Sequence, residues 1–250
     1  MTGQLKDKVA LVTGAARGIG RATAEALAAE GARPVLVDRD GAVAEVAREI
    51  GGAAHLCDLT DTEQLEAVVS EVSRYHGPID ILVNNAGLAR HNRIEDVSTE
   101  EIDLMWAVNA RAVMVLSRDA FRHMAGRGGQ IVNVVSTAGL RGGPGEAVYS
   151  ATKFAVRGFS ESLAEEGRVR GIRVHAVFPA GVDTEFWTDA TAAGPGVDPT
   201  DRFLAPADVA AAIVHALSRP SHMHVPELVL RAVGDADLAG IEAKLEWFRS

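Results

Sequence analysis

Residues 9–20 read VALVTGAARGIG, a short apolar run that passes directly into a glycine-rich turn. The run predicts a buried strand, and a helical pattern begins at once after the turn. Glycines permit positive φ angles and let the backbone approach a ligand closely. The start of the next helix offers free N–H groups and the positive end of the helix dipole, which suit a pyrophosphate. The stretch therefore predicts a strand–turn–helix unit that binds a dinucleotide.

The alternation of apolar runs with helical patterns continues along the chain. Strands are expected at 9–12, 34–37, 53–57, 79–83, 130–135, 173–178 and 227–230. Helices are expected at 21–30, 42–50, 62–75, 100–124, 151–169 and 206–217. The runs are continuously apolar, as expected when helices cover both faces of a sheet. We predict an α/β fold in one domain over residues 1–250, a doubly wound parallel (Rossmann) sheet of about seven strands that binds ligands at their carboxyl ends.

The composition indicates a soluble globular protein, because 47% of the 250 residues are hydrophobic and 24% are charged. A net charge of −9 argues against nucleic acid or an anionic membrane as a partner. Cys57 is the single cysteine, which excludes an internal disulfide and fits a reducing compartment. The first residues are polar and predict no secretory signal, and no apolar run approaches the roughly 20 residues that span a bilayer. We expect a cytoplasmic protein.

Local signals mark helix ends and one irregular segment. Gly31 stands where a helix-ending glycine is expected, and Asp61 with Gln64 can close a capping box. Residues 185–204 form the least regular stretch of the chain. Because this stretch follows the sixth strand at the binding edge of the sheet, we predict a substrate lid there. A passive surface insertion is the alternative.

Tyr149 and Lys153 stand four residues apart, so in a helix they share one face. A free tyrosine has a pKa of about 10 and is a poor base at neutral pH. The ammonium of Lys153 favours the phenolate and is expected to lower the pKa of Tyr149. The pair is therefore predicted to be a general acid/base that moves a proton on or off an alcohol oxygen.

Asp38 ends the second predicted strand, at the distance from Gly20 where dinucleotide folds place the acid that binds the adenosine ribose hydroxyls. A carboxylate at this place repels a 2′-phosphate, so Asp38 favours NAD over NADP. Arg39 and Arg17 leave NADP open, because either guanidinium can pair with a phosphate.

Several ordered motifs make the chain similar to the short-chain dehydrogenase/reductases, in the single-domain branch, from about residue 8 to residue 184. Residues 13–20 look like the TGxxxGxG turn of that family, and Asn84-Asn85-Ala86-Gly87 looks like its NNAG motif. Tyr149 and Lys153 match the YxxxK pattern. Three single residues also fall where the family has its adenine contact, its helix asparagine and its catalytic serine, namely Asp58, Asn109 and Ser136.

The resemblance implies a catalytic set of Asn109, Ser136, Tyr149 and Lys153. In the family, hydride moves between the nicotinamide and a substrate carbon, Tyr149 is the implied acid/base, and Lys153 lowers its pKa and bonds the nicotinamide ribose. Ser136 is implied to stabilise charge on the substrate oxygen, and Asn109 to hold a water that links Lys153 to solvent. The implied cofactor-binding residues are Gly14, Arg17, Gly18, Ile19, Gly20, Asp38, Arg39, Asp58, Leu59, Asn85, Ala86, Gly87, Tyr149, Lys153, Pro179, Val182 and Thr184.

Two features depart from the family pattern. Ala180 replaces a glycine after the sixth strand, and the chain ends without the Asp-Gly-Gly type of tail. The ending resembles the branch of 3-hydroxy acid and serine dehydrogenases, many of which prefer NADP. The substrate pocket is expected from 138–146, 180–183 and 185–204, with Phe186, Trp187 and Phe203 as apolar candidates. His91 and Arg93 either border the pocket mouth or lie on a plain loop.

Histidines elsewhere are not expected to bind metal. His215, His222 and His224 have no carboxylate or cysteine cluster beside them, so we expect no metal site. His175 lies in the sixth predicted strand and is expected to be a core residue with its hydrogen bonds satisfied.

We predict an oxidoreductase that transfers a hydride between NAD(H) and a secondary alcohol or ketone. One alternative is an NADPH-dependent ketoreductase of the same fold. The other is a dinucleotide-binding regulator without turnover, against which the presence of Ser136, Tyr149 and Lys153 argues. By resemblance we expect a homotetramer or homodimer through the helices that carry Asn109 and Tyr149. The expected partner is a small-molecule alcohol or ketone, whose identity the sequence does not give.

Overall fold

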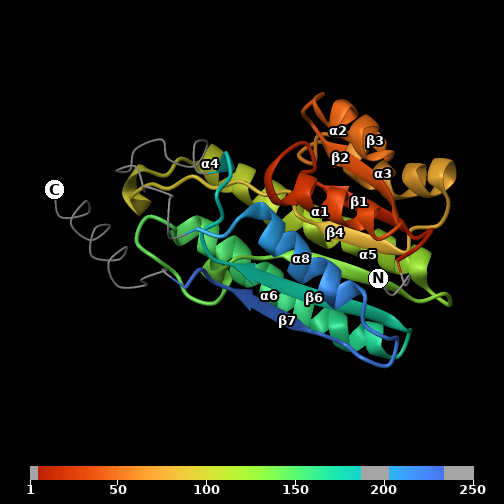
Figure 1. The fold of residues 1–250 in the computed structure, drawn as a ribbon. Helices are drawn as coiled ribbons and strands as arrows, with labels where there is room; N and C mark the ends of the chain where they lie inside the picture. Colours follow the sequence, from red (N-terminus) through yellow and green to blue (C-terminus); the bar gives the residue numbers. More distant parts are fainter. Residues whose placement is uncertain (1–4, 187–202, 234–250) are drawn as a thin grey trace.

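The computed structural model describes residues 5–186 and 203–233, which Figure 1 shows in colour. Within these residues, seven parallel strands lie side by side in the order β3-β2-β1-β4-β5-β6-β7. They are β1 (Val9–Thr13), β2 (Arg33–Asp38), β3 (Ala53–Leu56), β4 (Ile81–Asn84), β5 (Gly129–Val134), β6 (Ile172–Pro179) and β7 (Glu227–Leu230). The chain starts at β1, moves outward to β3, and then crosses back to β4 on the other side of β1. The predicted doubly wound parallel sheet is confirmed.

Helices cover both faces of the sheet (Figure 1). One face carries α1 (Gly18–Ala29), α2 (Val43–Ile50) and α8 (Pro206–Leu217), and the other carries α3 (Thr62–His76), α5 (Ala112–Met124) and α6 (Ala147–Arg168). Neighbouring residues of β1 serve different faces, because Val12 belongs to the first hydrophobic cluster and Leu11 to the second. The remaining elements are η1 (Ile94–Asp96), α4 (Thr99–Trp106), the π-helix η2 (Ala107–Arg111) and η3 (Thr137–Gly139).

Burial differs between the inner and the edge strands. Every residue of β1 and β4 is buried, as predicted for strands covered on both faces. In β3 and β7, more and less buried positions alternate, and Leu56 is 64% exposed. The expectation of continuous burial is therefore wrong for these two strands, because they lie at the edges of the sheet where cover is incomplete.

The helix boundaries shift in two places that matter for the site. α1 begins at Gly18 rather than at residue 21, so the last glycines of the turn form its first turn. α6 begins at Ala147 rather than at residue 151, which places Tyr149 inside the helix. The helix expected at 100–124 is divided by the π-helix η2.

The predicted helix caps are partly confirmed. Gly31 follows α1 with a φ of 83°, as a helix-ending glycine should. Asp61 caps α3 by accepting from the backbone N–H groups of Glu63 and Gln64. The predicted capping box is not formed, because the side-chain oxygen of Gln64 accepts from the backbone N–H of Asp58 at 3.0 Å instead.

Most of the predicted lid at 185–204, including Trp187, lies outside the described residues, so the lid stays a prediction. The chain on either side of that segment is joined by backbone hydrogen bonds: Asp183 donates to Leu204 at 2.9 Å, and Leu204 donates to Gly181 at 2.9 Å. In the described part of the chain, no helix is long and apolar enough to cross a membrane.

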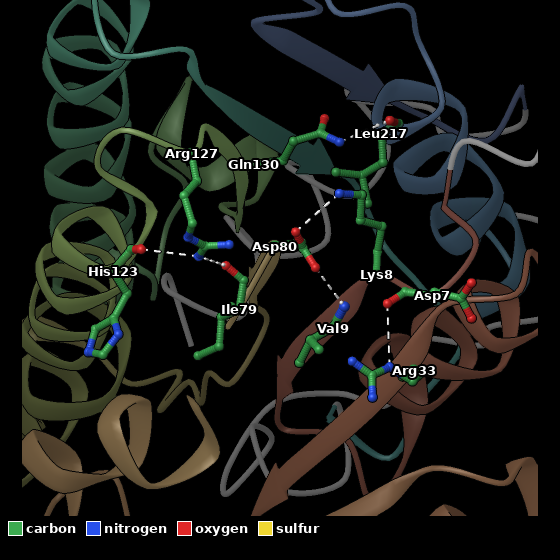
Figure 2. A network of polar contacts seen from close by, with 10 residues as sticks. All are labelled: Asp7, Lys8, Val9, Arg33, Ile79, Asp80, His123, Arg127, Gln130 and Leu217. Atoms are coloured by element: carbon green, nitrogen blue, oxygen red, sulfur yellow. Dashed lines mark hydrogen bonds and ion pairs between the residues drawn. The ribbon is translucent and has the colours of Figure 1, made fainter. Parts of the chain in front are cut away.

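The two ends of the strands carry different polar groups. At the amino end, shown in Figure 2, the Asp80 carboxylate accepts from Lys8 Nζ at 3.1 Å and from the backbone N–H of Val9 at 3.0 Å. Nearby, Arg127 donates to the backbone carbonyl of Ile79 at 3.3 Å, and Gln130 donates to that of Leu217 at 3.0 Å. At the carboxyl end lie the residues predicted to bind the cofactor and to catalyse the reaction.

Candidate active site

The glycine turn after β1 leaves no space for a side chain at Gly14 or Gly20. Gly14 and Gly18 have φ angles of 64° and 55°, in the left-handed region that favours glycine. A Cβ on Gly14 would lie 2.8 Å from the Cα of Ala86, and one on Gly20 would overlap the carbonyl oxygen of Gly14. The turn therefore needs glycine for its conformation at Gly14 and Gly18 and for close packing at Gly14 and Gly20.

The NNAG motif after β4 is hydrogen-bonded to this turn. Thr13 Oγ1 accepts from the backbone N–H groups of Asn85 and Ala86, each at 3.1 Å. In return, Asn85 Nδ2 donates to the carbonyls of Thr13 at 2.9 Å and Gly14 at 3.0 Å. These bonds fix the two motifs against each other. The contribution of Thr13 was missed in the sequence analysis, although the residue stands at the start of the glycine motif.

Asp38 lies at the carboxyl end of β2 and points at the glycine turn. One carboxylate oxygen accepts from the backbone N–H of Ala16 and the other from that of Asp40, both at 3.0 Å. Beside it is an open depression lined by Arg39, Asp40, Leu56, Asp58 and Gln64. The structure thus brings Asp38, Arg39 and Asp58 to one region, as predicted for an adenosine site.

The carboxylate of Asp58 is engaged locally, where it accepts from the backbone N–H of Thr60 at 2.9 Å and from its hydroxyl at 2.8 Å. Leu59 is buried beside it. On the far side of the glycine turn, a Cβ on Gly18 would lie 3.2 Å from the methyl group of Thr184. Arg17 is the N-cap residue of α1, and Ile19 packs against the core from the first turn of that helix.

The segment after β6 holds the other predicted cofactor residues. Pro179 ends the strand, and Val182 is buried and forms a bridge to Leu204. Ala180, which stands where the family has glycine, donates its backbone N–H to the carbonyl of Leu230 at 2.9 Å. Phe203 packs directly on Gly181, since a Cβ there would lie 2.5 Å from the phenylalanine ring.

Asn109 lies in the π-helix η2 and is completely buried. Its Oδ1 accepts from the backbone N–H of Leu88 at 2.9 Å, and its Nδ2 donates to the Leu88 carbonyl at 2.8 Å and to Thr152 Oγ1 at 3.2 Å. A π-helical turn inside an α-helix is often found at functional sites. Here it places Asn109 beside Gly87, where a Cβ would lie 3.4 Å from Asn109 Oδ1 and 3.6 Å from Lys153 Nζ.

Ser136 follows β5 with a φ of 146°, one of two positive φ angles among the described residues other than glycine. Such a conformation is strained for a residue with a side chain and is often found at active sites. Its Oγ accepts from the backbone N–H of Ala138 at 3.1 Å. Ser136 also lies close enough to the Tyr149 hydroxyl to lower the pKa of that phenol.

Tyr149 and Lys153 lie one turn apart in α6 and are 8% and 5% exposed. The Lys153 Nζ donates to the carbonyl of Val134 at 3.1 Å and lies 5.7 Å from the centroid of the Tyr149 ring. Burial lowers the pKa of the Lys153 ammonium to about 8. The predicted placement of the pair on one helix face is confirmed.

The pKa of Tyr149 differs from the expectation. Burial raises it well above the ordinary value, the nearby hydroxyl of Ser136 lowers it, and the negative charge of Glu146 raises it further. The expectation of a lowered pKa is wrong for this structure, because the cost of burying a phenolate outweighs the other effects. The influence of Glu146, three residues before Tyr149, was missed in the sequence analysis.

Two further rings flank Tyr149. The ring centroid of His91 lies 6.1 Å from that of Tyr149 in an edge-to-face arrangement, and that of Phe186 lies at 6.0 Å. Ala89, Met105 and Ala138 complete this small cluster. His91 therefore borders the site, and so does Phe186. Arg93 stays a prediction.

A buried polar network lies behind the site and connects the sheet to two helices. Asn84 Nδ2 donates to Ser117 Oγ of α5 at 2.9 Å and to Asn133 Oδ1 of β5 at 2.8 Å, and Asn133 donates to Ser160 Oγ of α6 at 2.8 Å. Because α6 also carries Tyr149, the network holds that helix in register with β4 and β5. The sequence offered only the polar side chains within apolar runs as a signal.

His175 and His224 have structural partners. His175 is completely buried, with Nδ1 2.7 Å from the carbonyl of Val225 and Nε2 3.2 Å from Gln130 Oε1. His224 Nε2 lies 2.7 Å from the carbonyl of Val174. The expected core role of His175 is confirmed. Among residues 5–186 and 203–233, no three His, Cys, Asp or Glu side chains gather closely enough to hold a metal ion.

Comparison with known proteins relates this arrangement to dinucleotide enzymes. A family model described as short chain dehydrogenase matches residues 8–194. D-threitol dehydrogenase of Mycolicibacterium smegmatis is 40% identical over 234 residues, which cover 88% of this chain and 89% of that enzyme.

Two solved structures extend the likeness to the fold. The crystal structure of 3-ketoacyl-(acyl-carrier-protein) reductase from Brucella melitensis complexed with NADH has a TM-score of 0.83 and 34% identity, covering 90% of this chain and 97% of that one. The closed form of serine dehydrogenase complexed with NADP+ has a TM-score of 0.84 and 28% identity, and the match covers 90% of this chain and 95% of that one.

Proposed function

Because the chain belongs to the short-chain dehydrogenase family and is an NAD(P)-dependent oxidoreductase acting on CH–OH groups, we propose that it interconverts a secondary alcohol and a ketone with NAD(H) as cofactor and Tyr149 as general acid/base. The observation that carries this proposal is the grouping of Tyr149, Ser136 and Lys153. They come from one helix and one strand end and meet at the carboxyl edge of the sheet, where Tyr149 and Lys153 are buried and Ser136 is partly exposed.

The residues at the glycine turn fit a dinucleotide. The N-cap residue of α1 makes no side-chain capping hydrogen bond, so the N–H groups of the first turn would be available to a pyrophosphate. Asp38 and the depression beside Arg39 would take the adenosine end, and Thr184 would take the nicotinamide end. When bound, the nicotinamide accepts or supplies the hydride.

The protein's own groups handle the proton and the developing charge. The Tyr149 hydroxyl would give its proton to a carbonyl oxygen in reduction and take the alcohol proton in oxidation. Ser136 would hydrogen-bond the same oxygen, and its constrained backbone helps to fix the direction of that hydroxyl. Lys153, with a pKa of about 8, is suited to passing protons near neutral pH, and the buried Asn109 beside it would anchor the path to solvent.

Charge at the adenosine end supports NAD over NADP. Asp38 directs its carboxylate at the glycine turn, and the neighbouring depression has two carboxylates, Asp40 and Asp58, with one guanidinium, Arg39. A 2′-phosphate would be repelled by the excess negative charge. The alternative, an NADPH-dependent ketoreductase, rests on Arg39 and Arg17, and relatives of both cofactor types are known.

The cofactor proposal is tested by titrating NADH and NADPH side by side at fixed salt. We expect NADH to bind more tightly, and Asp38→Asn to improve NADPH binding by roughly tenfold, since one like charge is removed. Asp40→Asn, which removes a neighbouring exposed carboxylate, serves as the control. It should change the ratio of NADPH to NADH affinity less than Asp38→Asn does. Tighter binding of NADPH to the wild type would favour the ketoreductase, and binding of neither would exclude dinucleotide chemistry.

Turnover separates an enzyme from a regulator. The panel consists of D-threitol, sorbitol and a 3-ketoacyl thioester, which the names of the relatives suggest as substrates. The two polyols are assayed in oxidation with NAD+ or NADP+ and the thioester in reduction with NADH or NADPH, each by nicotinamide absorbance. Turnover of any one supports the enzyme, and absence of turnover with all three would contradict the proposed function as an alcohol or ketone enzyme of these types.

An oligomer through α4, α5 and α6 is also part of the proposal. Trp106 of α4 is 41% exposed and Phe154 of α6 is 44% exposed, and large exposed apolar side chains often mark protein interfaces. Light scattering on the eluting protein measures the state directly. A dimer or tetramer that dissociates in Phe154→Glu supports this surface, whereas a wild-type monomer rejects it. The single cysteine, Cys57, is buried with a free thiol, in keeping with the proposed cytoplasmic location.

A further inference from the structure

Thr152 lies in α6 between Tyr149 and Lys153, and it is completely buried. Its hydroxyl donates to the backbone carbonyl of Tyr149, one turn back in the helix, at 2.7 Å. A hydroxyl has a single proton, so the oxygen is left as an acceptor, and Asn109 Nδ2 donates to it at 3.2 Å. The direction of both bonds is fixed, because a carbonyl only accepts and an amide nitrogen only donates.

The amide of Asn109 also binds the loop that follows the NNAG motif. Its Oδ1 accepts from the backbone N–H of Leu88 at 2.9 Å, and its Nδ2 donates to the carbonyl of the same residue at 2.8 Å. Leu88 packs against the apolar cluster that contains Tyr149. One buried amide therefore joins the NNAG loop, the π-helix η2 and the helix α6, and its hydrogen bond to α6 goes to Thr152.

This junction lies next to the groups that are proposed to react. A Cβ on Gly87, the last residue of the NNAG motif, would lie 3.4 Å from Asn109 Oδ1 and 3.6 Å from Lys153 Nζ. Lys153 directly follows Thr152 in the chain, and Tyr149 supplies the carbonyl that the Thr152 hydroxyl binds. A shift of this turn of α6 would therefore move the phenol and the ammonium together, relative to the loop that is proposed to hold the cofactor.

We propose that Thr152 is a positioning residue whose hydroxyl ties the first turns of α6 to Asn109 and so sets the position of Tyr149 for proton transfer. The inference rests on the proposed function, because it concerns the acid/base role of Tyr149. Thr152 does not touch the reacting atoms, since its hydroxyl is engaged in two internal hydrogen bonds. A misplacement of about 1 Å in an active site can lower a rate by roughly 10²-fold, so a small movement of the turn is enough to affect catalysis.

The same helix contains a matched control. Ser160 is also buried, its hydroxyl donates to the carbonyl of Val156 at 2.7 Å, and it accepts from Asn133 Nδ2 at 2.8 Å. Thr152 and Ser160 thus make the same pair of bonds, but Ser160 lies 11 residues beyond Tyr149, which is roughly 16 Å along the helix. Loss of either hydroxyl leaves a buried amide N–H with one acceptor fewer, so both losses should destabilise the fold.

The first test is steady-state kinetics with the panel substrate that has the highest rate. Thr152→Val keeps the branched shape and removes the hydroxyl, and we expect kcat to fall by roughly tenfold while KM and the Kd of NADH change by less than about twofold. Thr152→Ala should show the same fall, which covers the case in which valine does not pack. Thr152→Ser returns the hydroxyl and should recover kcat to within about twofold of the wild type. Ser160→Ala should lower the denaturation midpoint but keep kcat within about twofold.

The second test needs neither substrate nor cofactor. Chemical denaturation is measured for Thr152→Val, Asn109→Ala and the variant with both substitutions. Because the two side chains share one hydrogen bond, the double variant should lose clearly less stability than the sum of the two single losses. Ser160→Ala combined with Asn109→Ala should be additive, since these two residues do not share a hydrogen bond in the described structure.

The outcomes separate the two proposals. A wild type that turns over, with kcat unchanged in both Thr152→Val and Thr152→Ala, overturns this inference alone. An equal fall of kcat in Ser160→Ala would show a general loss of packing in α6 and would also overturn it, as would additive stability losses for Thr152 and Asn109. A wild type without turnover on the whole panel overturns the proposed function, and with it the role of Thr152 in catalysis.

Discussion

The amino and carboxyl ends of the strands use polar residues in opposite ways. At the amino end, Asp80 is paired with Lys8 and with a backbone N–H, and these groups are at least partly in contact with water (Figure 2). At the carboxyl end, Tyr149 and Lys153 are buried with shifted pKa values, and Ser136 has a strained backbone. One end uses polar groups to hold strands together, whereas the other keeps reactive groups in unfavourable surroundings. Such costs are typical of functional sites.

A substitution in the glycine turn should give the largest effect among the variants that compare the two ends of the strands. In Gly20→Ala the new methyl group would overlap a backbone carbonyl, so we expect the free energy of unfolding to fall by about 3 kcal/mol and NADH binding to weaken. Chemical denaturation and a binding titration measure the two effects.

Gly158→Ala is the matched control, because Gly158 is also helical but nothing lies near its missing Cβ. Alanine is the better helix former, so this variant should be more stable by about 0.5–1 kcal/mol. Equal effects of the two substitutions would show that the turn is not closely packed.

His175 tests whether every buried titratable group belongs to the chemistry. Burial lowers its pKa to about 4, with smaller contributions from the hydrogen bond to Val225, which raises it, and from His224 and Arg173, which lower it. The folded protein thus prefers the neutral ring, so its stability contribution is complete above the unfolded pKa of about 6.5 and is lost as the pH falls toward 4.

We therefore expect His175 to account for a loss of about 2 kcal/mol in unfolding free energy between about pH 7 and about pH 5. Denaturation curves of the wild type and His175→Asn at both pH values isolate this part, since other acidic groups contribute equally to both proteins. The turnover of the variant at neutral pH should be retained. A pH dependence identical to that of the wild type would mean that the ring titrates normally.

Replacing Asp80, at the amino end of the strands, should give the smallest effect on the free energy of unfolding. Asp80→Asn removes a charged pair whose lysine side chain is 47% exposed and weakens one charge-assisted bond to the backbone. We expect a loss of about 1 kcal/mol of stability, less at high salt, with kcat unchanged. A substantial fall in kcat with intact stability would contradict the separation of the two ends.

The parts of the structure that follow from local pattern were predictable. The seven strands and the shared face of Tyr149 and Lys153 follow from apolar runs and helical spacing. α6 begins earlier than predicted. Pro144 and Gly145 are typical loop residues, and they suggested a loop that continues beyond residue 147. The loss of the predicted capping box was also not predictable. The Gln64 side-chain oxygen accepts from the backbone N–H of Asp58 instead, and only the folded chain shows that this N–H is within reach.

Properties that depend on burial were beyond the sequence. The direction of the Tyr149 pKa depends on how completely the ring is enclosed by His91, Phe186 and their neighbours, which come from distant segments. The hydrogen bonds of Thr13 and Asn109 also join segments far apart in the chain. Spacing places a residue on a helix face, but only the assembled fold determines its dielectric surroundings.

Tyr149→Phe tests most directly the central claim that this phenol moves the proton. The substitution removes only the phenol hydroxyl and leaves the packing of the ring in place. We predict that kcat falls by roughly 10²–10⁴-fold while NADH affinity and the free energy of unfolding stay close to the wild type. A variant that turned over at the wild-type rate would contradict the claim that this phenol moves the proton.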